Sequence, residues 1–449
     1  MKKFLKWYAA SFILSCFLLL GMLFYFELTF DQVKGFYFQV LFQFMESLLF
    51  WICLAIPFIT YRLVRYLSHS YKTHGKMTFL RRFSFSIILP VGFLFSLFNF
   101  SQWYTKNENF DFEWKSEIEN KTDQATDLFA EDDKQRGVHV FGHLDSTNLQ
   151  PLIRTNVEWI TLVPFADQKD YDSPLLRYHH PERRTIINIE SRWSKSIELA
   201  HAYGFKVFFK PHIWIHDPSN GKWRSDIFPT NERNWETWQK SYREFILFYA
   251  RIAEKNNVEM FCIGTEFTRL AIEKPDFWEN LIQEIRTVYS GKITYAANWY
   301  NEYEKITFWD QLDFIGIQAY FPLVNNKNPT VKQISKGWKK RFPPLKKVSK
   351  KFDKKILFTE LGYKSTTDSA IEPWAWIDYS SNLYKPVSTE TQANCYEAFF
   401  KTVWKKDWFA GVHIWQWHTS EKNGGKDNLD FTPRKKPAEN IIAAGFGKN

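Results

Sequence analysis

The chain has 449 residues, enough for more than one domain, and its composition changes abruptly after the first hundred. Those residues are dominated by Phe and Leu, whereas the remainder mixes apolar runs with charges as globular domains do. The net charge of +10 does not indicate nucleic-acid binding, because six basic residues gather within 62–82, the others are scattered among acids, and no nucleic-acid motif occurs. The four cysteines, Cys16, Cys53, Cys262 and Cys395, contain no CxxC pair, which argues against a disulfide framework or a zinc cluster.

Three apolar runs near the N-terminus predict transmembrane helices. Residues 7–26 contain no charge and are long enough to cross a hydrocarbon core of about 30 Å. This run is too long for the apolar region of a cleaved signal peptide, and no small-residue cleavage site follows it. Two further apolar runs cover residues 36–61 and 83–104. Residues 1–104 are therefore expected to form a membrane anchor with three transmembrane helices.

The placement of Lys and Arg predicts the orientation of this anchor. Basic residues precede the first run and gather between the second and third, whereas only Lys34 lies between the first and second. Because cytoplasmic loops carry an excess of Lys and Arg, the N-terminus and a loop over 62–82 are expected in the cytoplasm. The multi-pass membrane protein would then place everything after Tyr104 outside the cytoplasm.

Two features of the N-terminal third have no assigned role. Glu46 interrupts the second apolar run and follows Gln39 and Gln43. An intramembrane carboxylate is a functional candidate, but a hydrogen bond between helices is the favoured interpretation. Residues 105–136 contain no Gly or Pro and are rich in Asp and Glu, which predicts a polar stalk.

Residues 137–449 repeat one pattern, in which a short β-branched or aromatic run is followed by a loop and an amphipathic helix. The strand candidates are 138–141, 159–164, 206–214, 259–266, 292–299, 313–321, 355–361 and 411–418. Helical patterns cover 194–203, 235–255, 276–289, 331–350 and 391–404. This alternation over about 300 residues predicts an α/β fold, a (β/α)8 TIM barrel. A doubly wound open sheet is disfavoured, because the first strand is not followed by a Gly-rich phosphate turn.

The C-terminal ends of barrel strands, where active sites are built, carry acids, amides and aromatics. These residues are Asp145, Lys210, His212, Trp214, Glu266, Asn298, Trp299, Gln318, Tyr320, Glu360, Trp415, Trp417 and His418. The longest loops, 165–188, 216–233 and 362–390, leave from the same end of the barrel and carry Trp223, Trp374 and Trp376.

Glu266 and Glu360 end the fourth and seventh strand candidates. Both follow apolar runs, where an unpaired charge would be expensive to bury. Strand alternation predicts that both carboxylates project toward the barrel axis. Glycoside hydrolysis uses two such groups, one protonated to assist the leaving group and one ionised to attack the anomeric carbon. A salt-bridge or rim role for both glutamates is less favoured, given the aromatic residues around them.

Several motifs resemble those of glycoside hydrolase family 113, within the retaining glycosidases of clan A. They are Lys210-Pro211-His212, Gly264-Thr265-Glu266, the run 313–317, Thr359-Glu360-Leu361-Gly362 and Trp415-Gln416-Trp417. The best-known members of that family are endo-acting β-mannanases. The resemblance spans residue 137 to the C-terminus and implies that Glu266 is the general acid/base and Glu360 the nucleophile of a double displacement.

One residue departs from the pattern of the clan. Thr265 stands where most members carry an Asn whose amide holds the sugar 2-hydroxyl. That contact must come from another residue here, and Asn298 is the candidate.

The other strand-end residues are candidates for binding substrate. They are Lys210, His212, Trp214, Asn298, Trp299, Gln318, Tyr320 and Trp417. Tyr320 and Lys210 are expected to hold the pKa of Glu360 low, whereas Glu266 needs an apolar environment to keep its proton. Trp299, Trp415 and Trp417 offer flat faces for pyranose rings, and Trp415, deeper in its strand, is expected in the core instead.

No metal and no cofactor is expected. His212 and His216 are four residues apart beside Asp217, but a strand-to-loop segment does not place two imidazoles on one face. The expected partners are a polysaccharide or oligosaccharide substrate and the lipid bilayer. The sequence therefore predicts a membrane-anchored retaining glycoside hydrolase acting on β-linked hexose polymers, with β-mannan favoured. A non-catalytic carbohydrate sensor and a membrane-associated transglycosylase are the alternatives.

Overall fold

The computed structural model describes residues 48–93, 95–96, 132–178, 186–377, 387–420 and 422–447. The chain divides into two compact units, residues 1–107 and residues 108–449. The barrel and every strand that the structure describes belong to the second unit.

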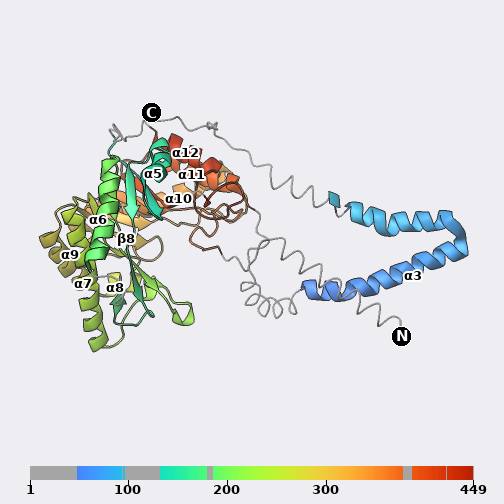
Figure 1. The fold of residues 1–449 in the computed structure, drawn as a ribbon, viewed down its shortest axis with the longest axis horizontal. Coiled ribbons are helices and arrows are strands. Elements are labelled where there is room, and N and C mark those ends of the chain that lie inside the picture. The colour runs from blue at the N-terminus through green and yellow to red at the C-terminus, as the bar shows by residue number, and fades with distance from the viewer. Residues whose placement is uncertain are drawn as a thin grey trace. The chain divides into compact units, whose positions relative to one another are not determined.

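In the first unit, helix α3 (Leu48–Phe83) continues into the π-helical turn η1 (Ser84–Ile88). The prediction of a loop over 62–82 is wrong, because these residues are helical. They include good helix formers such as Leu, Arg, Lys and Met and no Pro, so local preference supports the helix. Only Gly75 inside α3 has a non-helical backbone, with φ 79° and ψ 176°, and Figure 1 shows α3 changing direction along its length.

The predicted membrane runs fall partly or wholly outside the described residues. Run 7–26 and Glu46 lie outside them, and runs 36–61 and 83–104 are described only in part. Gln39 and Gln43 and most of the stalk also lie outside. Among the residues that the structure describes, no helix combines the length and hydropathy needed to span a bilayer.

In the second unit, parallel strands close into a barrel, which confirms the predicted TIM-barrel fold. In order around the ring they are β1 (Gln135–Phe141), β2 (Trp159–Leu162), β5 (Lys206–Phe209), β7 (Met260–Thr265), β8 (Lys292–Asn298), β9 (Phe314–Gln318), β10 (Ile356–Leu361) and β11 (Phe409–His418). Each predicted strand is present. Strands β7 and β10 are buried along their whole length, as expected for parallel strands covered by helices outside and side chains inside.

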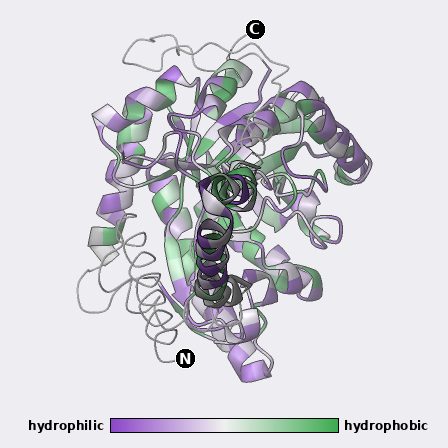
Figure 2. Ribbon diagram, turned by 90° about the vertical axis from the view of Figure 1, so that its right-hand side faces the viewer, coloured by the Kyte–Doolittle hydropathy of each residue, from purple (hydrophilic) through white to green (hydrophobic). Residues whose placement is uncertain are grey.

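Helices surround this barrel (Figure 1). They are α5 (Ser146–Arg154), α6 (Ile186–Ala202), α7 (Glu232–Lys255), α8 (Thr268–Glu273), α9 (Pro275–Val288), α10 (Val331–Phe352), α11 (Thr389–Thr402) and α12 (Pro437–Phe446). Figure 2 shows that they carry both hydrophilic and hydrophobic residues. In α7 the buried Trp238, Tyr242 and Phe245 recur at spacings of four and three, which gives the helix one apolar face. Asp145 caps α5, since its Oδ1 accepts backbone N–H groups from Thr147 and Asn148.

The third predicted strand, 206–214, is two strands. It breaks at Lys210 and Pro211 between β5 and β6 (His212–Ile215), because proline has no N–H to donate to the barrel ladder. Strand β6 pairs instead with β3 (Phe165–Gln168), which pairs with β4 (Leu176–Arg177) in a separate three-stranded sheet. This small sheet continues the chain beyond the C-terminal ends of β2 and β5, and so it stands beside the predicted site.

Candidate active site

Glu266 follows directly after β7, at the C-terminal end of the barrel. Its φ of 54° lies in the left-handed region, which residues other than glycine rarely adopt. Its backbone N–H donates to the Ala296 carbonyl at 2.9 Å. Its Oε2 accepts a hydrogen bond from Nη2 of Arg224 at 2.9 Å, and both side chains are largely buried. The backbone turn and the guanidinium together fix where this carboxyl points.

Glu360 lies in β10, paired in register with Gln318 of β9, which pairs in turn with Asn298 of β8. Nζ of Lys210 donates to Oε1 of Glu360 at 2.5 Å, and the Tyr320 hydroxyl donates to Oε2 at 2.7 Å. Both carboxylate oxygens therefore have a donor. The two contacts predicted for this residue are present.

The electrostatic outcome differs from the sequence-based expectation. Burial raises the pKa of Glu360, whereas the Lys210 ammonium and the hydrogen bonds from Lys210 and Tyr320 oppose that rise. The prediction of a low pKa is wrong, because the loss of water outweighs the two donors. The charge of Glu266 also raises the pKa of Glu360, so the two carboxyl groups are within electrostatic reach of each other.

A layer of buried histidines surrounds Lys210. Nε2 of His139 lies 3.4 Å from Nζ of Lys210, and Nε2 of His212 lies 3.8 Å from Oε1 of Glu360. Burial lowers the pKa values of His139, His212 and His413 well below the ordinary value, and the Lys210 charge lowers them further. These imidazoles are therefore neutral near pH 7, which leaves Lys210 as the cation next to Glu360.

Gln318 joins this arrangement, since its Oε1 accepts a hydrogen bond from Nζ of Lys210 at 2.9 Å. The hydroxyl of Tyr320 keeps its proton, because burial and the charge of Glu360 raise its pKa well above 10. The structure thus brings four predicted site residues, Lys210, His212, Gln318 and Tyr320, around Glu360.

Three other predicted residues lie at the rim of the site. Trp214 is on β6, outside the barrel, and its ring meets Trp223 edge-on at 5.7 Å. Oδ1 of Asn298 accepts the backbone N–H of Tyr300 at 3.1 Å. Trp299 stacks on Trp374, with ring centroids 5.1 Å apart and planes at 27°.

The two tryptophans of β11 exchange the places that the sequence predicts. Trp417 is 1% exposed and lies in the main hydrophobic core, so the prediction that it contacts substrate is wrong. Trp415 packs instead with Tyr320 and Phe431 and lies parallel to the His212 ring. The cause is an irregularity in β11 between its pairings with Val138 and Val140, which interrupts the two-residue alternation.

Two ionisable residues near Glu266, Arg224 and Glu302, were not predicted from the sequence. Arg224 lies in the 3-10 turn η3 (Arg224–Asp226), within the long loop that was noted for its Trp223. Glu302 follows β8 and is completely buried. Neither residue lies at the end of a strand, so a search of the strand ends for functional side chains could not find them. For Arg224 the available signal was a charge within the loop 216–233, which was already expected to border the site, whereas Glu302 lies outside the three expected loops.

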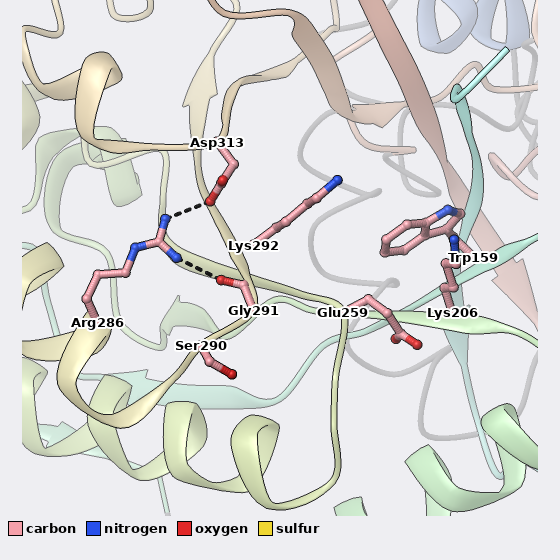
Figure 3. A pocket seen from close by; sticks show the side chains of 8 residues that line it. All are labelled: Trp159, Lys206, Glu259, Arg286, Ser290, Gly291, Lys292 and Asp313. Carbon is pink, nitrogen blue, oxygen red and sulfur yellow. Dashed lines mark hydrogen bonds and ion pairs between the residues drawn. The ribbon is translucent and has the colours of Figure 1, made fainter.

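A hollow of about 330 Å³ lies at the opposite, N-terminal end of the barrel (Figure 3). Its lining residues are Trp159, Lys206, Glu259, Arg286, Ser290, Gly291, Lys292 and Asp313. Arg286 is occupied there, because it bonds Asp313 and the Gly291 carbonyl at 2.7 Å each. The hollow contains none of the predicted site residues, and the chemistry lies at the other end of the barrel.

Comparison with known proteins identifies the barrel. The profile of Glycoside Hydrolase Family 113 matches residues 141–436, well over half of the chain. The chain belongs to glycoside hydrolase family 113. It is similar to a structure described as a complex of a GH113 β-1,4-mannanase, with 26% identity and a TM-score of 0.59, covering 70% of this chain and 98% of that one.

A second solved member of family 113 is similar to the same extent. It is the β-mannanase AaManA from Alicyclobacillus acidocaldarius in complex with ManMIm, with 27% identity, a TM-score of 0.58, and coverage of 70% of this chain and 97% of that one. A search of curated proteins gave no match. Family 113 membership makes this chain a glycoside hydrolase.

Proposed function

We propose that this chain is a retaining β-mannanase-type hydrolase in which Glu360 is the nucleophile and Glu266 the general acid/base. The main support for this proposal is that the two carboxyl groups have different hydrogen-bond partners and different places in the barrel. Both oxygens of Glu360 accept donors from Lys210 and Tyr320 inside the barrel, whereas Glu266 lies on the turn after β7. The carboxylate of Glu360 is therefore oriented to attack the anomeric carbon, and the carboxyl of Glu266 is placed to exchange a proton with the glycosidic oxygen or with water.

Double displacement assigns each group a step. The ionised Glu360 attacks the anomeric carbon while the carboxyl of Glu266 gives its proton to the departing glycosidic oxygen, which leaves a glycosyl ester on Glu360. Water then attacks that carbon, Glu266 takes the proton of the water, and the Glu360 carboxylate leaves. Lys210 and Tyr320 orient Glu360 and stabilise the negative charge that returns to it in the second step.

Arg224 orients the acid/base for both of these steps. Nη2 of its guanidinium donates to Oε2 of Glu266 at 2.9 Å, and both side chains are largely buried. One carboxyl oxygen of Glu266 is therefore held by a fixed donor, which sets the direction in which the carboxyl faces the sugar.

Aromatic side chains at the rim suit a polymer. Trp299 with Trp374, and Trp214 with Trp223, present rings on two sides of the barrel opening. Trp214 and Trp374 are partly exposed, and their apolar faces match the C–H faces of pyranose rings. The two solved relatives are described as β-mannanases, which supports β-1,4-linked mannose as the sugar.

The test is hydrolysis by the full chain in detergent. We expect it to release reducing ends from soluble β-1,4-mannan and manno-oligosaccharides, and Glu360→Ala to abolish that release. A panel of other soluble β-linked polysaccharides serves as comparison. Cleavage of a different polymer would reject the sugar and keep the reaction, whereas transfer to an added acceptor sugar without net hydrolysis would indicate a transglycosylase.

We propose further that the N-terminal region anchors the enzyme in a membrane with the barrel outside the cytoplasm. The support is the three apolar runs, 7–26, 36–61 and 83–104, together with the basic residues of 62–82. A reporter that fluoresces only in the cytoplasm, fused after Asn449, should stay dark. Bright cells, or a chain that washes off membranes in alkaline carbonate, would reject the anchor.

A further inference from the structure

Glu302 is a buried carboxyl that the mechanism above does not use. It is fully enclosed, four residues after the end of β8. Its Oε1 accepts the hydroxyl of Tyr295 at 2.5 Å. Its Oε2 accepts the hydroxyl of Thr268 at 2.9 Å and the backbone N–H of Asn298 at 2.7 Å. A carboxyl with this many partners organises the segments that supply them.

Those segments are the two that follow the acid/base in the fold. Thr268 comes two residues after Glu266, and the Tyr295 hydroxyl also accepts the backbone N–H of Phe267 at 2.8 Å. Asn298 is the last residue of β8. Glu302 therefore ties the turn after Glu266 to the end of the neighbouring strand. No other acid among the described residues bonds both segments.

The turn at Glu266 has a backbone conformation that must be held by contacts with its surroundings. Glu266 has a φ of 54°, a backbone conformation that is unfavourable for a side-chain-bearing residue and persists only where its surroundings fix it. The preceding strand packs closely on the same tyrosine, since a Cβ built on Gly264 would lie 2.8 Å from the Tyr295 ring. Tyr295 thus braces the strand before Glu266 and, through Phe267, the turn after it.

The charge state of Glu302 is consistent with a structural tie. Burial raises its pKa to about 8, so this carboxyl keeps its proton near neutral pH. In the neutral carboxyl, Oε1 would carry the proton and donate it to the Tyr295 hydroxyl, while Oε2 still accepts the Thr268 hydroxyl and the Asn298 N–H. A glutamine side chain has the same shape and also combines a donor with an acceptor.

We propose that Glu302 is a positioning residue for the acid/base, holding the turn of residues 266–268 so that the Glu266 carboxyl faces the glycosidic oxygen. This inference rests on the proposed function of Glu266. It predicts a defect confined to the proton transfers of Glu266, of which kcat/KM reports the donation in the first step, because Lys210, Tyr320 and Glu360 are held by other strands.

The test compares kcat/KM for two substrates with different leaving groups. A manno-oligosaccharide needs its leaving group protonated, whereas a dinitrophenyl β-manno-oligosaccharide does not. Glu302→Ala should lower kcat/KM about 100-fold on the first and less than about threefold on the second, because acid catalysis serves only the first. Glu302→Gln should stay close to wild type on both substrates. The matched control is Glu304→Ala, an exposed acid two residues along, which should change neither value.

Two results would overturn the inference. Equal losses on both substrates in Glu302→Ala would indicate a general structural role, and no loss in a folded variant would indicate none. If the wild type cleaves neither substrate, the proposed function itself fails. Crystal structures of the wild type and Glu302→Ala then decide the positioning role, and an unmoved Glu266 turn in the variant would reject it.

Discussion

The ammonium of Lys210 lies 2.5 Å from Oε1 of Glu360, and both side chains are buried. This cation opposes the effect of burial on the carboxyl. The fall in kcat/KM toward low pH should therefore depend on the ion pair between Lys210 and Glu360.

Replacing Lys210 by Met removes the opposing charge, so the already raised pKa of Glu360 should rise further. Since the nucleophile works ionised, activity is lost as pH falls through that pKa. The acid limb of kcat/KM should move to higher pH, with a loss of at least about tenfold on the acid side, as a shift of one pKa unit or more requires. The control is Lys206→Met, at the opposite end of β5, which should leave the pH dependence of kcat/KM unchanged. If the pH dependence of kcat/KM is unchanged in Lys210→Met, the charge of Lys210 does not control the pKa of Glu360.

The two glutamates should answer differently to azide. Glu360→Ala should lose the covalent step, and azide should then give a glycosyl azide of inverted configuration. Glu266→Ala should still react with activated aryl glycosides, and azide should give a product of retained configuration. NMR of the early products distinguishes these outcomes. An inverted wild-type product, or the two azide results exchanged, would reverse the assigned roles.

The tryptophans of the core and of the rim should affect different quantities. Trp417→Ala should lower the free energy of unfolding by about 3–5 kcal/mol, as expected for a large side chain removed from a core. Trp374 is 42% exposed, so Trp374→Ala should change stability by less than about 0.5 kcal/mol while raising KM for manno-oligosaccharides. Denaturant unfolding and steady-state kinetics measure the two effects. An unchanged KM in Trp374→Ala would show that Trp374 does not contribute to binding of the manno-oligosaccharide.

Glu302 also predicts how stability depends on pH. Its pKa is raised to about 8 in the folded chain, so between the ordinary glutamate value and about pH 8 the folded state binds more protons than the unfolded state. Stability should therefore fall as pH rises through this window, by about 1.4 kcal/mol for each unit of the shift. Glu302→Gln cannot ionise, so its Tm relative to wild type should increase from pH 5 to pH 9. A difference in Tm that stays constant with pH would mean that Glu302 is ionised throughout.

The barrel could be predicted because its signals are local. Each strand is a short run of apolar residues, and the chemistry sits where such a run stops, as at Glu266 and Glu360. Trp417 shows the limit of this reasoning, because alternation along β11 fails at its irregular pairing with β1. The 62–82 stretch shows another, since its charges suggested a loop while its residues favour a helix.

Contacts between distant segments could not be predicted in this way. Arg224 reaches Glu266 across 42 residues of sequence, and Glu302 bonds Thr268 across 34. No periodicity links such positions, because their proximity results from the closure of the barrel. The raised pKa of Glu360 was missed for the same reason, since it depends on how completely the surrounding strands exclude water.

The three-stranded sheet of β4, β3 and β6 is separate from the closed ring of barrel strands. Its strand β6 nevertheless reaches the catalytic site, because His212 lies 3.8 Å from Glu360, whereas Trp214 on the same strand is 39% exposed. A substitution at Trp214 should therefore leave the ring and the carboxyl of Glu360 in place, while a substitution at His212 should disturb them. The exposed side of this small sheet is thus where the choice of polymer could be altered without altering the reaction.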